Sequence, residues 1–414
     1  MAFLLDEIGA ILLDELGEAL LEEGDDSFEI IRETIREFFA QYAIDLCVGW
    51  MRVAEATACV FDGVVRNLAA GEWRLAGAVD SLAFVPGYTL SDVDTIRIIS
   101  DADIVFAGFV TPITAGVGGL NVTHSSDGER FTLTGPDAWA VLASRVAYPT
   151  PATGPPWADS HDVRTGLAST VAAGYITDNA GVGATVDRQI PGLTVVDGSA
   201  GTSGEWSARL QPLDQLVARV CRDGGITCRI VIGYDGTIQV TVCAPRDRRT
   251  TTVLSDQGDL TNIQHISVPT TTTFVIAGGQ GNLTARTFAS AGSAIGVARR
   301  EVFSDQSSLA SSTEVQQAAN TQLLSDSAML TVRAEATDTA SLTFEYLAGY
   351  NIGDTIAAEI GTIRYPVVIE SVTFQISPER SVIRPVLGDA APNLVTGLIR
   401  DVAGLTARLD TQIA

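Results

Sequence analysis

Residues able to do acid-base or nucleophilic chemistry are few in this sequence of 414 residues, and they lie far apart. It has three histidines, His124, His161 and His265, and contains neither a His-Glu-x-x-His nor a Gly-x-Ser-x-Gly motif. His161 is the most suggestive, because Asp159 and Asp162 flank it, but it lies in a polar stretch typical of a solvated loop. We therefore predict no catalytic residues.

Four carboxylates, Asp92, Asp94, Asp101 and Asp103, lie on either side of the apolar run at 95–99. Clustered carboxylates can catalyse glycoside hydrolysis or bind calcium. Asp is also a frequent turn residue, because its side chain hydrogen-bonds to nearby backbone groups. Turns at the two ends of a strand are the simpler prediction for these four residues.

The five cysteines are an odd number and do not form a disulfide framework. Cys221 and Cys228 flank Gly224-Gly225, and Cys243 is a possible third ligand of a metal ion, but no histidine lies near to complete a site. Free cysteines in apolar runs are usually buried. We predict buried thiols and no metal.

A glycine-rich segment, Gly278-Gly279-Gln280-Gly281, follows a β-rich run and could cradle a phosphate. A Walker A loop needs lysine, which this sequence lacks entirely. A dinucleotide site needs a helix directly after the loop, whereas 283–288 has an extended pattern. The segment is therefore predicted to be a wide turn, and no cofactor is expected.

The composition limits the possible partners. The formal net charge of −24 argues against wrapping of nucleic acid or binding to an anionic membrane, because both need a positive surface. It is compatible with a channel through which DNA passes without sticking. The absence of lysine is typical of GC-rich coding, with salt adaptation as an alternative. The acidic N-terminus is not a secretory signal, and no apolar stretch is long enough to span a membrane.

The clearest structural pattern is a β-meander near the C-terminus. Residues 355–360, 367–376 and 382–387 are rich in β-formers, and Gly353-Asp354 and Gly361 mark turns. Further strands are predicted at 72–75, 95–99, 104–110, 131–134 and 271–277.

Between Pro136 and Arg246 the periodicity changes. Helices are predicted at 137–146, 163–173 (ending at Gly174) and 211–223, followed by a hairpin over 227–242. Outside this region, further helices are predicted at 29–42 and 313–325. The exposed bases Arg246, Arg248 and Arg249 are expected to lie on a solvated face, or to contact an acidic neighbour.

The order of these motifs resembles that of the baseplate hub proteins of long-tailed (siphovirus-type) bacteriophages. The resemblance rests on Trp73-Arg74-Leu75, Asp94-Thr95-Ile96, Phe106-Ala107-Gly108, and the final run from Tyr350-Asn351-Ile352-Gly353-Asp354 to Gly388. It implies a mainly β fold with two hub-type β-barrel domains and an α+β insert, in a phage of a GC-rich actinobacterial host. The expected domains are 28–134 (first barrel), 135–255 (insert) and 256–392 (second barrel).

The N-terminal extension, 1–27, repeats a Leu-Leu-acid-acid unit every eight residues, with leucines at Leu4, Leu12 and Leu20. Its nine acids and no bases, between Met1 and Asp26, make it strongly acidic. An amphipathic helix or short strands with turns both fit, although Gly9 and Gly17 would each cost a helix about 1 kcal/mol. Either structure needs a partner surface to cover the leucines.

The tail, 393–414, has the apolar spacing of a coiled-coil seam. About three heptads are short for an independent coil, so a single docked helix is the alternative. The resemblance implies three strands. The predicted trimer-interface residues are Val395, Leu398, Val402, Leu405 and Leu409.

The resemblance therefore implies a non-enzymatic virion component: a homotrimeric hub at the distal end of the tail. Its implied partners are the distal tail protein ring, the C-terminus of the tape measure protein, and tail fibre or tip proteins, with DNA only as passing cargo. Contact with the host cell surface would be indirect. A receptor-binding protein that recognises polysaccharide through Trp157 is the alternative. A cell-wall hydrolase is disfavoured because few residues follow Gly388.

Overall fold

A computed structural model describes residues 42–100, 103–110, 119–126, 128–157, 159–268, 270–307, 309, 311–326, 329–336, 346–347, 349–378 and 381–388. The acidic repeat with Leu4, Leu12 and Leu20, most of the helix predicted at 29–42, and the coiled coil at 393–414 lie outside these residues. The described chain is mainly β, with few helices, as predicted.

A five-stranded antiparallel sheet is built from the first part of the described chain. Two of its strands, β6 (Thr95–Ser100) and β7 (Asp103–Phe109), run as largely apolar residues, which is the pattern from which they were predicted. The order across the sheet is β5 (Leu82–Phe84), β2 (Met51–Ala56), β1 (Ala43–Val48), β6 (Thr95–Ser100) and β7 (Asp103–Phe109).

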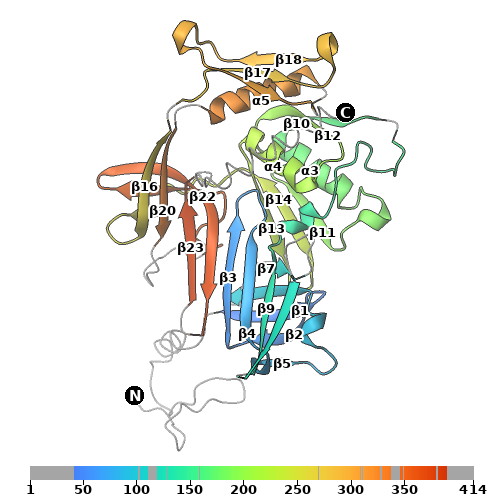
Figure 1. The fold of residues 1–414 in the computed structure, drawn as a ribbon, viewed down its shortest axis with the longest axis vertical. Helices are drawn as coiled ribbons and strands as arrows, with labels where there is room; N and C mark the ends of the chain where they lie inside the picture. Colours follow the sequence, from blue (N-terminus) through green and yellow to red (C-terminus); the bar gives the residue numbers. More distant parts are fainter. Residues whose placement is uncertain are drawn as a thin grey trace, which may run out of the picture.

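A ten-stranded sheet joins strands from the two ends of the sequence. Its centre is the antiparallel pair β3 and β22, in which Phe61 lies opposite Ile376 (Figure 1). A side branch through β22 adds β21 (Thr355–Ile360) and β15 (Val253–Ser255). The main order is β16 (Leu260–Val268), β20 (Met329–Ala336), β23 (Ser381–Leu387), β22 (Ile363–Ile376), β3 (Cys59–Arg66), β4 (Glu72–Ala78), β9 (Gly128–Pro136) and β8 (Gly119–Ser125).

The described strands form open sheets, not the two closed barrels that were predicted. The physical reason is that β3 pairs with β4 on one edge but with β22 of the final meander on the other, where closure would need a partner from its own barrel. A strand of the first predicted barrel therefore pairs with a strand of the second. Strand β7 meets the end of β9 only at an isolated bridge between Gly108 and Asp137.

The α+β insert packs two helices on a small mixed sheet. Helix α4 (Leu213–Gly224) confirms the prediction at 211–223, and Gly225 ends it in the left-handed conformation. The helix predicted at 163–173 was wrong in its first half: that half forms a strand, and Gly174 lies inside α3. The remaining elements are α2 (Ala140–Ala143), α3 (Ala168–Asn179), a pair of β10 (Asp162–Leu167) with β12 (Ser203–Ala208), and a sheet of β11 (Leu193–Asp197), β14 (Ile238–Cys243) and β13 (Thr227–Ile232).

A small unit, residues 274–325, lies between β16 and β20 along the chain and at one end of the molecule (Figure 1). Helix α5 (Ser312–Ser325) begins at Ser311, whose side chain accepts a hydrogen bond from the Glu314 backbone. The helix covers one face of a three-stranded sheet: β18 (Phe288–Ala291), β17 (Phe274–Gly278) and β19 (Glu301–Asp305). The sequence did not separate this unit from the second β region.

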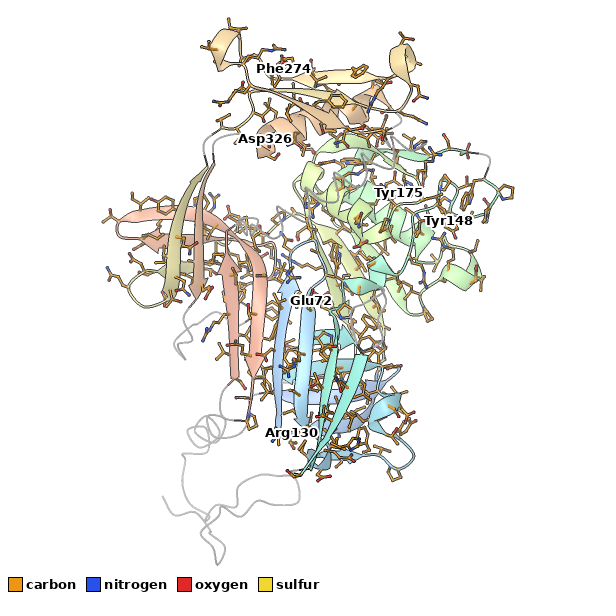
Figure 2. The ribbon with its side chains drawn as sticks, viewed as in Figure 1. Glu72, Arg130, Tyr148, Tyr175, Phe274 and Asp326 are labelled. Atoms are coloured by element: carbon orange, nitrogen blue, oxygen red, sulfur yellow. The ribbon has the colours of Figure 1, made fainter. Side chains whose placement is uncertain are left out.

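Three hydrophobic cores hold these parts together. The largest lies between the two large sheets and includes residues from β3, β4, β7, β9 and β22. The second fills the insert, where Figure 2 shows Tyr175, and the third lies under α5 in the unit that carries Phe274. Among the described helices, none is long and apolar enough to cross a membrane.

Candidate functional site

The three histidines lie on three different elements. His124, on β8, is exposed and pairs with Glu129 at 2.9 Å, while His161 precedes β10 and contacts Ser160. His265 belongs to β16. In the part of the chain that the structure describes, no group of three or more His, Cys, Asp or Glu side chains could hold a metal ion.

Of the four aspartates around β6, Asp92 acts in a local turn, as predicted. The Asp92 carboxylate accepts hydrogen bonds from the backbone and hydroxyl of Thr89, at 2.8 and 2.7 Å, and these lower the pKa of Asp92. The Asp94 carboxylate accepts a hydrogen bond from the Gly49 backbone at 2.9 Å. Asp103 begins β7, and Asp101 lies outside the described residues.

The cysteines are free thiols. Cys221 and Cys228 are buried in the insert core, and burial raises the pKa of Cys221 to about 12 and that of Cys228 well above its ordinary value. Thiols with pKa values this high stay protonated and inert at neutral pH.

The glycine-rich segment is a turn whose carbonyl groups contact the side chain of Arg286. Arg286 donates hydrogen bonds to the carbonyl oxygens of Gly278 and Gly279, at 2.9 and 3.0 Å, and pairs with Asp305. The segment therefore presents carbonyl groups to an arginine, which is the reverse of a phosphate cradle.

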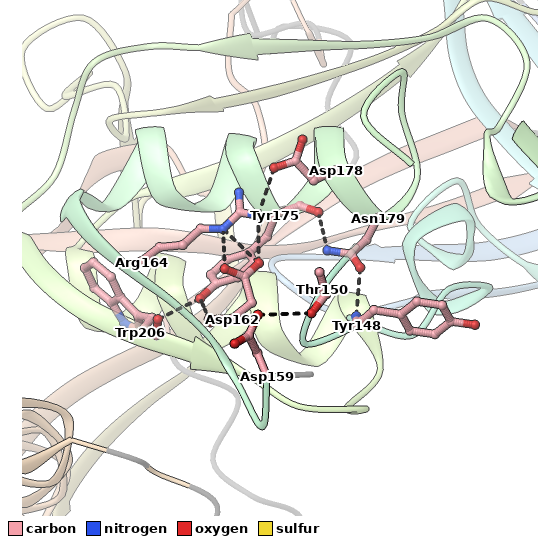
Figure 3. A network of polar contacts seen from close by, with 9 residues as sticks. All are labelled: Tyr148, Thr150, Asp159, Asp162, Arg164, Tyr175, Asp178, Asn179 and Trp206. Atoms are coloured by element: carbon pink, nitrogen blue, oxygen red, sulfur yellow. Dashed lines mark hydrogen bonds and ion pairs between the residues drawn. The ribbon is translucent and has the colours of Figure 1, made fainter. Parts of the chain in front are cut away.

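The proline-rich loop around Trp157 is anchored to the insert. The Trp157 indole donates a hydrogen bond to the Thr153 carbonyl at 3.0 Å, and its ring lies 4.8 Å from that of Tyr148. The Tyr148 backbone donates to the Asn179 side chain at 2.8 Å (Figure 3). The Arg188 guanidinium stacks on the Tyr148 ring. Trp157 is half-buried in this arrangement, and its role as a partner contact stays a prediction.

A polar network below this loop joins β10, α3 and β12. Arg164 forms ion pairs with Asp162 at 2.7 Å and Asp178 at 2.8 Å (Figure 3). The Tyr175 hydroxyl lies within hydrogen-bonding distance of the carbonyl oxygens of Trp206 and Asp162. Since every group in it has a protein partner, the network is structural.

Asp354 is a buried residue in the turn before β21, and its contacts connect the two β regions with the insert. Its side chain is 0% exposed and forms ion pairs with Arg229 of β13 and with Arg248, whose Nε lies 3.4 Å away. The carboxylate also accepts a hydrogen bond from the Asn351 backbone at 2.9 Å. We call Asn67, Thr227, Arg229, Arg248, Gly353 and Asp354 the central junction.

Backbone contacts complete the central junction. Gly353 has a φ of +78°, and a Cβ there would lie 2.5 Å from the Thr227 hydroxyl, so glycine is required. The Thr227 hydroxyl donates to the Asn67 side chain at 3.3 Å, and the Asn67 backbone donates to the Glu370 carbonyl at 2.8 Å. Residues of the first β region, the insert and the second β region thus meet at one point.

Sequence reasoning found two of the six residues of the central junction. Gly353-Asp354 was recognised as a turn, but its ionic partners were missed. The sequence did contain an indication that Arg229 has a partner, because it is the one charged residue of strand β13. Arg248 was expected on a solvated face or against an acidic neighbour; it is three-quarters buried and paired with Asp354.

A second buried carboxylate, Asp137, lies at the end of β9 beside a cavity of about 100 Å³. One oxygen accepts a hydrogen bond from the Trp139 backbone at 3.1 Å, and the other has no hydrogen-bond partner among the described residues. Burial raises the pKa of Asp137 from 3.8 to about 7, against the smaller opposing effects of backbone hydrogen bonds and of the Arg66 charge.

We expect Asp137 to make stability depend on pH. Between about pH 4 and about pH 7 the folded carboxyl keeps a proton that the unfolded one has released, so the free energy of unfolding falls as pH rises. The total fall corresponds to about 4 kcal/mol and is complete above about pH 7. Urea unfolding of wild type and Asp137→Asn should therefore diverge with pH, the variant gaining relative stability toward pH 8. Parallel pH profiles for the two proteins would contradict this assignment.

Several solved structures are similar to this chain. The structure of the 43 kDa tail protein of prophage MuSo2 from Shewanella oneidensis superposes with a TM-score of 0.52 at 9% identity, covering 84% of this chain and 98% of that one. A tail protein from Neisseria meningitidis MC58 gives 0.49 at 13% identity, covering 85% and 97%. The prophage tail protein gp18 from Listeria monocytogenes EGD-e gives 0.49 at 9% identity, covering 89% and 100%.

No curated protein matches the sequence. A family model described as Siphovirus ReqiPepy6 Gp37-like protein matches residues 90–389, which is most of the chain. The matched region includes the insert, the unit with α5 and the meander that supplies Asp354. The chain therefore belongs to the Siphovirus ReqiPepy6 Gp37-like protein family.

Proposed function

We propose that the chain, a structural protein of a phage tail, forms a homotrimeric baseplate hub that closes the distal end of the tail tube. The observation that carries the proposal is that contacts join the two β regions and the insert within one subunit. One ten-stranded sheet contains strands of both β regions, and the central junction fastens the insert to them. A subunit with this connectivity would resist being pulled apart between the tube above it and the fibres below.

Exposed apolar side chains support assembly with other chains. Val182 and Val186 in the insert are 81% and 86% exposed, and Ile295 and Val297 near β19 are 80% and 106% exposed. Exposed apolar side chains mark contacts between subunits where they gather into a patch, and we propose that each of these two pairs belongs to such a contact. In a trimer the two β regions of each subunit would supply six around the axis, matching a sixfold tube.

The proposed partners follow from this position. The distal tail protein ring and the tape measure C-terminus would contact the hub from above, and fibre or tip proteins from below. The net charge of −24 suits a lumen through which DNA passes without binding. The role proposed here is mechanical, without enzymatic activity, and host contact would be made through the attached proteins.

Light scattering tests the trimer. We expect the full chain to have about three times the 43.5 kDa of one subunit, and the chain truncated after residue 392 to form a weaker trimer, because the predicted seam at Val395, Leu398, Val402, Leu405 and Leu409 is lost. Dilution series of both proteins would give their dissociation midpoints. A full-length chain that stays monomeric at every concentration would refute the trimeric hub. Equal midpoints would refute the coiled coil alone.

A further inference from the structure

A second cavity, of about 250 Å³, lies between the insert and the unit that carries α5. One wall consists of β12 and α4, and the other is mainly the face of α5 that looks toward them. The exposed residue Ser325 lines one side, so the cavity reaches solvent there. The lining side chains that could recognise a ligand are Glu205, Trp206, Arg219, Asp223, Glu314 and Gln317.

Glu314 is the unusual member of this lining. It is 3% exposed, yet neither carboxylate oxygen has a hydrogen-bond partner among the described residues. It lies in the first turn of α5, where the helix dipole favours a negative charge but does not replace lost hydration. A buried carboxylate without donors is costly, and such groups are normally paired or hydrogen-bonded.

The other charges around the cavity leave it negative. Asp223 accepts hydrogen bonds from the Trp206 indole at 3.2 Å, from the Gln317 amide at 3.5 Å and from the Thr321 hydroxyl at 3.3 Å, all neutral donors. Arg219 donates to the Ser207 carbonyl at 2.7 Å, and its buried Nε has no hydrogen-bond partner among the described residues. With Glu205, the lining described here contains three carboxylates and one guanidinium.

We propose that this cavity binds a guanidinium or primary ammonium group. The bound cation forms an ion pair with the Glu314 carboxylate, and the Asp223 carboxylate supplies a second negative charge. A metal ion fits less well, because the described residues contain no group of ligands that could hold one. The volume exceeds the roughly 30 Å³ that one water molecule takes up in the liquid, so a small organic cation has room. The source is either a free amine or an arginine of a neighbouring chain, since this sequence has no lysine.

Binding would connect two parts of the molecule. Asp223 lies on α4 of the insert and Glu314 on α5, and Gln317 and Thr321 of α5 donate hydrogen bonds to Asp223. A cation held by both carboxylates adds charge-assisted hydrogen bonds across this boundary. The small unit would then be held more firmly against the insert.

Agmatine, which carries both a guanidinium and an ammonium group, is a suitable probe. We expect calorimetry to show binding to the full chain, and Glu314→Gln to weaken it by about tenfold or more. The matched control, Glu129→Gln, removes an exposed carboxylate on β9 and should bind as wild type does. Sodium chloride at equal ionic strength controls for screening. Equal affinities for wild type and Glu314→Gln, or no binding to wild type, would overturn the proposal.

Two further measurements sharpen the test. Without ligand, Glu314→Gln should be at least as stable as wild type in urea, because it removes an unpaired buried charge. A variant destabilised by more than the roughly 1 kcal/mol that the helix dipole contributes would mean that the carboxylate already has a partner within the chain, and would overturn the proposal. Light scattering with agmatine separates the sources: a fall in assembly mass identifies an arginine of a neighbouring chain, and an unchanged mass identifies a free cation. The test is independent of the proposed hub.

Discussion

Replacing Asp354 by alanine is expected to lower the free energy of unfolding by about 3–5 kcal/mol, because it leaves the Arg229 guanidinium buried without its anion. The Arg229 side chain is 10% exposed, so water cannot take the place of the carboxylate. Arg248 loses the same partner, and the Asn351 backbone loses its acceptor. Urea unfolding followed by tryptophan fluorescence measures the loss.

One further variant at position 354 and a matched control separate the effect of losing the charge from the effect of losing the side chain. Asp354→Asn keeps an oxygen for the Asn351 backbone but removes the negative charge, so most of the destabilisation should remain. Asp247→Asn is the matched control: its exposed carboxylate pairs with Arg249 in solvent, and little change is expected. If Asp354→Asn unfolds at the same urea concentration as Asp247→Asn, the ion pairs do not hold the three regions together.

The local elements could be predicted well from the sequence, and for clear reasons. The strand at 355–360 was found with the bounds predicted, since β-forming residues there are closed by a glycine turn at Gly361. Helix α4 has an apolar stripe and a glycine stop, and both features are local. The strand β10 was mistaken for helix because Val163 and Leu167 are four residues apart, whereas its exposure alternates residue by residue.

The pairing of strands could not be predicted, because alternation fixes which side chains face the core but not which strand lies alongside. Nothing in β22 indicates that β3, some three hundred residues earlier, is its neighbour. The same limit applies to the candidate site. Asp354 was visible as a turn residue, but Arg229 lies 125 residues away, and only the folded chain brings the two charges together.

The second large effect is expected at Phe374, on β22. Its side chain is 0% exposed, and its ring lies 5.4 Å from that of Phe106 and 5.6 Å from that of Tyr346. Phe374→Ala should lower the free energy of unfolding by about 3–5 kcal/mol, as other truncations of buried phenylalanines do. The loss arises because apolar burial is lost and a cavity is left behind. Urea unfolding measures this loss as well.

Phe374 also tests whether the two β regions unfold together. Phe106 belongs to β7 in the first region, so a shared core predicts that Phe374→Ala lowers the protection of the β7 amides against hydrogen exchange as much as that of the β22 amides. Phe288→Ala is the control, because that side chain is 56% exposed on β18 and its loss should leave both strands unchanged. Protection lost in β22 alone would mean that the regions unfold separately, and that the continuous sheet does not by itself couple one end of the subunit to the other.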